Sequence, residues 1–158
     1  MAIRRAALLG IAVFLAGCAS APALVDSSSP PTRVPRGEAI SRLARGQVGR
    51  PYRHGGDGPD GFDCSGLSQY VYAAFGIHLP RTAVAQAAAA TPVERDQLAP
   101  GDLVFFRFGS AGRVDHVGLY VGDGRFVHAP KAGARVVDVA LDAPWFARRY
   151  VSAGRVVR

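Results

Sequence analysis

The chain has 158 residues, of which 49% are hydrophobic and 20% are charged. This length and composition exclude a multi-domain protein and a wholly disordered one. The net charge of +7 fits either a coding bias toward arginine or a surface that binds polyanions. Two cysteines are too few for a small fold held together by several disulfides.

The first residues have the pattern of a bacterial export signal. Arg4 and Arg5 precede an apolar run over residues 6–16, which is well short of the roughly 20 residues that span a bilayer as a helix. The run ends in L-A-G-C, which resembles a bacterial lipobox, and its last residue is Cys18. We therefore expect a signal peptide over residues 1–17 and lipidation of Cys18, with an ordinary signal peptide as the alternative.

The segment that follows is rich in proline and serine and has no periodic apolar face. We expect residues 18–36 to form the lipidated cysteine and a disordered tether, and residues 37–158 to form the folded domain. Because alanine and not aspartate follows Cys18, the expected location in a Gram-negative cell is the periplasmic face of the outer membrane.

Helices come first in the domain. Apolar residues recur at helical spacing over residues 40–48, which predicts a first helix. Residues 50–62 are rich in glycine and proline and are predicted to form a loop. Asp63 stands at an N-cap position before a second helix that ends near Gly76. A third helix is expected over about residues 82–90.

Strands follow the helices after residue 101. Apolar and alternating runs predict five of them, over residues 103–108, 114–121, 125–128, 135–139 and 150–157. Helices followed by consecutive strands predict an α+β fold, in which the N-terminal helices pack on an antiparallel sheet of about five strands.

Cys64 is a candidate nucleophile. If Asp63 caps the second helix, the Cys64 sulfur lies beside unpaired backbone N–H groups and the positive end of the helix dipole, which favour the thiolate. The glycines that precede it would let a substrate backbone approach closely. From the residues alone, a buried structural cysteine is the alternative.

His116 and His128 form a second candidate group. They lie twelve residues apart, centred on Gly122 in a G-D-G turn signal. A tight turn there would bring them nearly opposite on adjacent strands, on the sheet face opposite the apolar one. One histidine could then act as a base that the other orients. Two solvated histidines are one alternative, and a zinc site with Cys64 is another, although the close-spaced ligand pairs typical of zinc are missing.

Five segments occur in the order R-P-Y-R-H-G-G, F-D-C-S-G-L, L-P-R-T, L-A-P-G-D-L-V-F-F and D-H-V-G-L-Y-V-G-D-G-R-F-V-H-A-P. Together they resemble the NlpC family of papain-like cell-wall cysteine peptidases over nearly the whole domain. The resemblance implies a papain-like fold. The short layout is most similar to the lipoprotein type of murein endopeptidase in that family.

The resemblance also implies roles for individual residues. Cys64 would be the nucleophile, His116 the general base and acid, and His128 the residue that orients His116. Tyr52 matches a family tyrosine that lines the site and helps to bind the oxyanion, together with the Cys64 backbone N–H. Ser65 matches a position that touches the substrate.

Other polar residues near these motifs receive no catalytic role. Asp63 is expected to be structural and Asp115 to be non-catalytic, because it lies where the family varies. His54 and His78 are expected to be solvated surface histidines.

The implied reaction is hydrolysis of an amide in a peptidoglycan stem peptide, without a metal or an organic cofactor. The bond would be the D-alanyl–diaminopimelate cross-link or the γ-D-glutamyl–diaminopimelate bond. Expected partners are peptidoglycan and, through the lipid anchor, a membrane; no nucleic-acid module is recognisable. A non-catalytic wall-binding lipoprotein and a papain-like acyltransferase or small-amide hydrolase are the alternatives.

Overall fold

The computed structural model describes residues 35–110 and 112–156. The expected signal peptide, Cys18 and residues 19–34 of the expected tether lie outside the described residues. Helix α1 (Arg36–Arg45) begins at the last residue assigned to the tether, so the folded part starts slightly earlier than predicted. Each helix within the described ranges is too short or too polar to span a bilayer.

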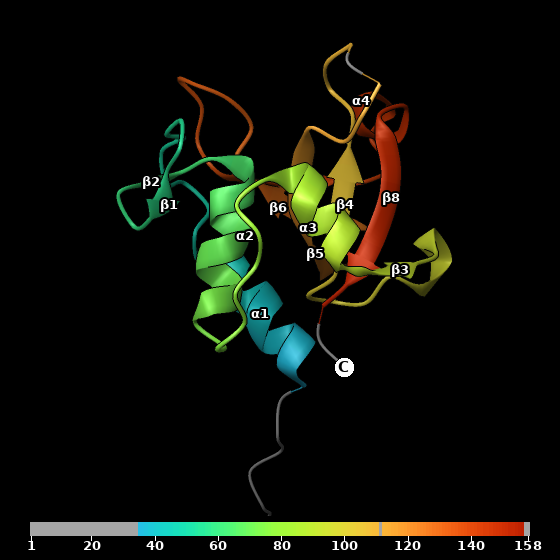
Figure 1. Ribbon diagram of the computed structural model, residues 1–158, viewed down its shortest axis with the longest axis horizontal. Coiled ribbons are helices and arrows are strands. Elements are labelled where there is room, and N and C mark those ends of the chain that lie inside the picture. The colour runs from blue at the N-terminus through green and yellow to red at the C-terminus, as the bar shows by residue number, and fades with distance from the viewer. Residues whose placement is uncertain (1–34, 111, 157–158) are drawn as a thin grey trace, which may run out of the picture. The chain divides into compact units, whose positions relative to one another are not determined.

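Three helices cover one face of the sheet (Figure 1). Helices α1, α2 (Cys64–Ala73) and α3 (Ala83–Ala89) correspond to the three predicted helices. The side chain of Asp63 accepts a hydrogen bond from the Gly66 N–H at the start of α2, as predicted, and Thr82 caps α3 in the same way. These caps satisfy backbone donors that have no partner inside the helix.

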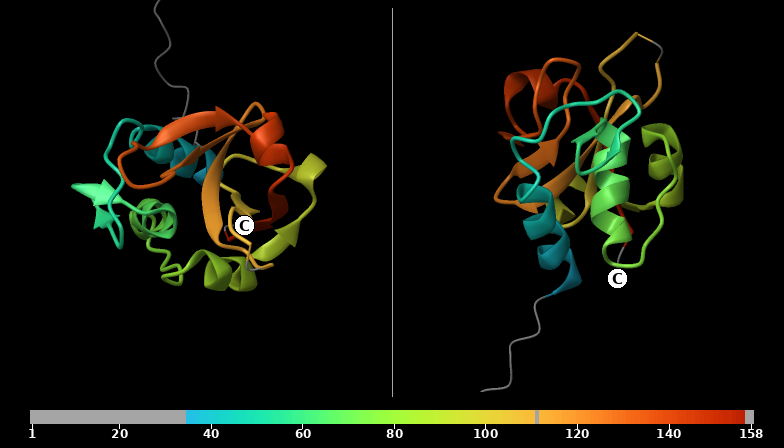
Figure 2. Two further views of the ribbon diagram at one scale, coloured as in Figure 1. Left: turned by 90° about the horizontal axis from the view of Figure 1, so that it is seen from above. Right: turned by 90° about the vertical axis from the view of Figure 1, so that its left-hand side faces the viewer.

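The sheet is antiparallel and has six strands in the order β3-β8-β4-β5-β6-β7. The strands are β3 (Thr91–Val93), β4 (Leu103–Phe106), β5 (His116–Gly122), β6 (Arg125–His128), β7 (Val137–Ala140) and β8 (Tyr150–Arg155). The predicted α+β class is therefore confirmed, and the sheet has one strand more than expected. From above, the sheet is seen to curve (Figure 2).

Both faces of the sheet are apolar. Leu103 and Phe105 of β4 pack with the helices, while their neighbours Val104 and Phe106 point to a second cluster on the other face. Phe146, from the short helix α4 (Pro144–Ala147), packs against this second cluster. The face that bears the histidines, predicted to be opposite the apolar one, is thus apolar as well, because α4 and the residues around it cover it.

The β5–β6 hairpin turns at the predicted G-D-G. Gly122, Asp123 and Gly124 all have positive φ, at 93°, 53° and 66°, a conformation that glycine adopts without strain. The register shifts within β5 between Tyr120 and Gly122. In this register His128 lies opposite Gly118, two positions from His116, so the two histidines are diagonal and not directly opposite. The one-residue shift at the bulge puts both side chains on the same face.

Several short elements depart from the predictions. The predicted loop 50–62 contains a two-stranded hairpin of β1 (Asp57–Gly58) and β2 (Gly61–Phe62). Edge strand β3, the 3-10 turn η1 (Arg95–Gln97) and helix α4 were not expected. Each has two to four residues, too few to establish a hydrophobic period.

Candidate active site

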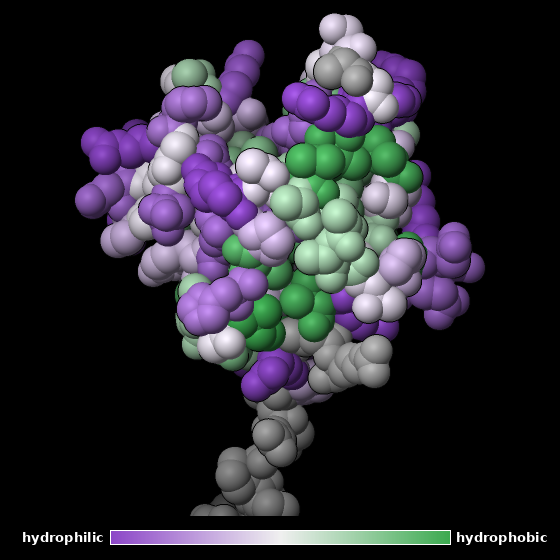
Figure 3. All heavy atoms as spheres, in the orientation of Figure 1, coloured by the Kyte–Doolittle hydropathy of each residue, from purple (hydrophilic) through white to green (hydrophobic). Residues whose placement is uncertain are grey.

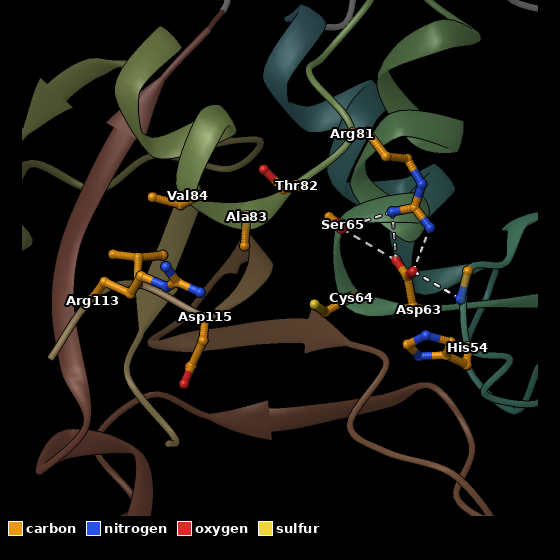
Figure 4. A pocket seen from close by; sticks show the side chains of 12 residues that line it. His54, Asp63, Cys64, Ser65, Arg81, Thr82, Ala83, Val84, Arg113 and Asp115 are labelled. Atoms are coloured by element: carbon orange, nitrogen blue, oxygen red, sulfur yellow. Dashed lines mark hydrogen bonds and ion pairs between the residues drawn. The ribbon is translucent and has the colours of Figure 1, made fainter. Parts of the chain in front are cut away.

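A pocket of about 580 Å³ opens at the N-terminus of α2 (Figure 4). Its wall is built from four segments of the chain: the loop before β1, the first turn of α2, the start of α3 and the loop before β5. The lining residues are His54, Gly55, Asp63, Cys64, Ser65, Arg81, Thr82, Ala83, Val84, Arg113, Val114 and Asp115. Hydrophobic side chains gather over α3 on the face seen in Figure 3. Val84 of this helix is an exposed hydrophobic residue.

Asp63 holds the first turn of α2 in place. One carboxylate oxygen accepts from the Gly66 N–H at 2.7 Å, and the other accepts from the Gly55 N–H at 3.1 Å. Both oxygens also accept from the Arg81 guanidinium. Burial raises the pKa of the Asp63 carboxyl, but the hydrogen bonds from Arg81 and Gly66 outweigh burial and keep the pKa below its usual value. The structural role expected for Asp63 agrees with this geometry.

Cys64 is the first residue of α2, and its thiol is free and half-buried. The backbone N–H groups of Val117 and Ser65 lie near its sulfur and act to lower the pKa of the thiol. Burial nevertheless raises the pKa of the thiol, and the negative charge of Asp63 adds to this effect. The expected thiolate is therefore not favoured in the free protein, because burial outweighs the helix N-terminus. A base is needed to remove the proton.

His116, the first residue of β5, contacts His128, the last residue of β6. Nε2 of His116 lies 2.7 Å from Nδ1 of His128, and the two residues are only 4% and 2% exposed. Solvated histidines on an open sheet face are therefore excluded. The contact between Cys64 and Val117 brings the sulfur to the point where β5 begins, directly after His116.

Aromatic rings enclose the histidine pair. The Phe108 ring stacks on His116 with 4.2 Å between centroids, and Phe146 meets the edge of His128 at 5.3 Å. Burial lowers the pKa of His116 well below its usual value, and the neighbouring His128 lowers it further. Burial also lowers the pKa of His128, to about 4. Both imidazoles are therefore neutral at pH 7. A neutral imidazole can accept a proton.

A zinc site finds no support in the geometry. Within residues 35–110 and 112–156, no three His, Cys, Asp or Glu side chains are grouped so that they could hold a metal ion. The histidine nitrogens that face each other are already within hydrogen-bond distance. A cation between them would have to break that contact.

Tyr52 and Ser65 lie beside the thiol in different ways. Burial raises the pKa of the Tyr52 phenol, and the negative charges of Asp63 and of a deprotonated Cys64 add to this effect, so the phenol stays protonated. The Ser65 hydroxyl lines the pocket, donates to Asp63 at 3.2 Å and accepts from Arg81 at 3.0 Å. Ser65 is thus part of the Asp63–Arg81 network.

The remaining polar residues named from the sequence have clear positions. Asp115 accepts from the backbone N–H groups of Phe108 and Gly109, both at 2.7 Å, which ties together the loop before β5. His54 is exposed, as expected, although it lines the pocket. His78 is exposed on a separate, smaller pocket.

Sequence reasoning missed two residues that support the site. Arg81 lies inside the L-P-R-T segment, but its ion pair with Asp63 was not predicted. Gln86 is fully buried, and its amide donates to the Ser65 and Pro80 carbonyls at 3.0 and 2.8 Å. The sequence does contain a hint of this role, because Gln86 is the only polar residue in an alanine-rich helix. A glutamine that is buried in such a helix needs hydrogen-bond partners nearby.

Comparison with known proteins adds to this picture. The model of the NlpC/P60 family matches residues 49–155. The murein DD-endopeptidase MepH of Escherichia coli is 45% identical over 123 residues, which cover 75% of this chain and 45% of that protein. A gamma-D-glutamyl-L-lysine dipeptidyl-peptidase of Bacillus cereus is 37% identical over 109 residues, covering 68% of this chain and 33% of that protein. The chain thus spans less than half of either relative.

Two solved structures share the fold. A NlpC/P60 family protein from Bacillus cereus superposes with a TM-score of 0.74 at 33% identity, over 78% of this chain and 41% of that one. The NlpC/p60 domain of the peptidoglycan hydrolase SagA superposes with a TM-score of 0.67 at 36% identity, over 77% of this chain and all of that domain. From its sequence match, its relatives and its fold, the chain belongs to the NlpC/P60 family.

Proposed function

We propose that this protein is a cysteine peptidase that hydrolyses amide bonds in peptidoglycan stem peptides. The observation on which the proposal rests is the buried His116–His128 pair at the start of β5, next to the strand residue whose N–H contacts the Cys64 sulfur. The names of the relatives, a murein endopeptidase and a dipeptidyl-peptidase, support the same substrate class.

The proton transfer follows from the two imidazoles. Nε2 of His116 is engaged with His128, so Nδ1 is the nitrogen that takes the proton from Cys64 as the sulfur attacks the carbonyl. The Nε2–H of the resulting imidazolium donates to the neutral Nδ1 of His128. His116 then protonates the leaving amine, and water hydrolyses the thioacyl intermediate.

Two donors serve the oxyanion in this proposal. The Cys64 N–H is in the first turn of α2, where backbone donors have no acceptor inside the helix. The Tyr52 hydroxyl, whose pKa burial raises, stays protonated and can donate. Donors fixed before the reaction stabilise the developing charge without reorganisation.

The bond we favour is the D-alanyl–diaminopimelate cross-link, because a similar protein is named a murein DD-endopeptidase. The second candidate is the γ-D-glutamyl bond within a stem, which the name of the dipeptidyl-peptidase relative supports. We further propose export, lipidation of Cys18 and attachment to the periplasmic face of the outer membrane, from the L-A-G-C segment.

The test is a digest of purified muropeptides by the full-length chain, read by mass spectrometry. Cleavage of the cross-link converts dimers to monomers, whereas cleavage of the γ-D-glutamyl bond splits the stems. Cys64→Ala should abolish product formation. Cys18→Ala is the matched control, since it removes the other cysteine and should leave solution activity unchanged.

Two results would contradict the proposal. Hydrolysis that survives Cys64→Ala would overturn the assignment of the nucleophile. A reduced, folded protein that cleaves no muropeptide would favour a wall-binding lipoprotein that retains the fold.

A further inference from the structure

The thiol pocket is lined by two carboxylates and two guanidinium groups. Asp63 is paired with Arg81. The Asp115 carboxylate accepts two backbone hydrogen bonds and points away from the thiol (Figure 4). Arg113 also lines the pocket, and among the described residues it forms no ion pair. Of the two guanidinium groups, Arg81 is held by Asp63, whereas Arg113 is in no ion pair within the described part of the chain.

The position of this guanidinium is set by the loop before β5. Figure 4 shows Arg113 on the wall across from Arg81, with its side chain extended toward the space in front of Cys64. The loop is fastened on both sides of Arg113: the Asp115 N–H donates to the Phe106 carbonyl at 3.1 Å, and the Arg107 side chain donates to the Gly112 carbonyl at 3.4 Å.

A second source of positive potential lies close by. The N-terminus of α2, a helix of ten residues, opens into the same pocket at Cys64. Its backbone dipoles favour an anion there. Together with Arg113, it makes the mouth of the pocket suitable for a carboxylate placed near the scissile bond.

Substrates of the proposed class contain such a carboxylate. In a D-alanyl–diaminopimelate cross-link, the carbon that bears the scissile nitrogen also bears a free carboxylate. A guanidinium matches a carboxylate with two parallel hydrogen bonds. We propose that Arg113 is a specificity-determining residue that binds the diaminopimelate carboxylate on the leaving-group side of the scissile amide. This inference rests on the proposed function.

The experiment compares two cross-linked muropeptide dimers that differ only in amidation of that carboxylate. The full-length wild type should cleave the free-acid dimer with a kcat/KM about tenfold higher than the amidated one, near the low end for a hydrogen bond to a charged group. Arg113→Gln should remove the preference by slowing only the free-acid dimer. Arg113→Lys should keep part of it, because the charge remains.

Arg42→Gln is the matched control. It removes the same charge from an exposed arginine of α1 that does not line the pocket, and it should leave both rates and the preference unchanged. Thermal unfolding of Arg113→Gln should match that of the wild type, because the side chain is exposed.

Failure of this inference can be told apart from failure of the proposed function. If the wild type cleaves both dimers and Arg113→Gln keeps the wild-type preference, the role of Arg113 is overturned while the endopeptidase proposal stands. If the wild type cleaves both dimers equally well, the role is likewise overturned. If the wild type cleaves neither dimer and no other muropeptide, both proposals fall.

Discussion

Nε2 of His116 lies 2.7 Å from Nδ1 of His128, and the two rings are held edge to face inside an apolar cluster. Diagonal pairing across a bulged hairpin creates this contact. The arrangement fixes which nitrogen of each ring can take part in proton transfer. It also makes both protonation states depend on burial.

His128→Ala should lower kcat about a hundredfold, within the range that general acid–base catalysis contributes, and leave KM nearly unchanged. The reason is that His116 loses both its orientation and the acceptor for its Nε2–H. His128→Asn should recover about tenfold in kcat, since its amide oxygen can accept in a similar position. Steady-state kinetics on a cross-linked muropeptide measures both. A kcat that alanine leaves intact would remove His128 from the site.

The stability of the protein should fall in acid because of the same pair. The pKa of His128 is lowered to about 4 in the folded state, whereas an unfolded histidine has a pKa of about 6.5. The unfolded chain therefore binds the proton first as pH falls, so the stabilisation is complete above about pH 6.5 and is lost as pH falls toward 4. At pH 5 the loss from His128 alone is about 2 kcal/mol.

Urea unfolding at pH 7.5 and pH 5 measures this effect. The comparison with His128→Asn isolates it from the titration of carboxylates, because the variant lacks only the histidine. The difference in unfolding free energy between the two pH values should be smaller in the variant. Equal differences in the two proteins would show that His128 is not the group responsible.

The meeting of the two histidines could be predicted because its cause is local. The G-D-G turn and the even spacing are visible in the sequence, and with the one-residue bulge between Tyr120 and Gly122 they place both side chains on one face. The aromatic side chains that bury the two histidines could not be predicted. Helix α4 has four residues, Pro144–Ala147, and Phe146 reaches the histidines only through the tertiary fold.

The protonation state of the Cys64 thiol also could not be predicted from the sequence. The N-cap at Asp63 was correctly predicted from the residue type and its place before an apolar run, and it does position Cys64 at a helix N-terminus. Whether this position favours the thiolate of Cys64 depends on how deeply the sulfur is buried. The packing of α2 on β5, which are far apart in the sequence, determines that burial. Edge strand β3 was missed for a related reason, since Thr91–Val93 contains a proline and pairs with β8, a strand far along the chain.

The reactivity of Cys64 toward iodoacetamide should reflect its protonated resting state. Burial raises the pKa of the thiol, and the thiolate is the reactive form. The alkylation rate of the substrate-free enzyme should therefore keep rising with pH through about 8.5, the usual value for a cysteine. Mass spectrometry of the Cys18→Ala variant follows this single thiol. A rate that is already constant at pH 7 would contradict the expectation and indicate a preformed thiolate.

Gly66 should tolerate no side chain, because the first turn of α2 lies directly against the loop before β1. A Cβ at Gly66 would be 2.0 Å from the Gly56 carbonyl oxygen, a backbone atom that cannot swing aside. We expect Gly66→Ala to cost at least about 3 kcal/mol in unfolding free energy, since overpacking against a rigid neighbour strains the structure. Activity should fall as well, because any shift of this turn moves Cys64.

Gly58→Ala is the matched control, since a Cβ there meets no atom within 4 Å, and it should change stability by less than about 0.5 kcal/mol. Urea unfolding of the two variants at pH 7.5 tests the contrast; equal stabilities would mean that α2 and the Gly56 loop can separate without cost.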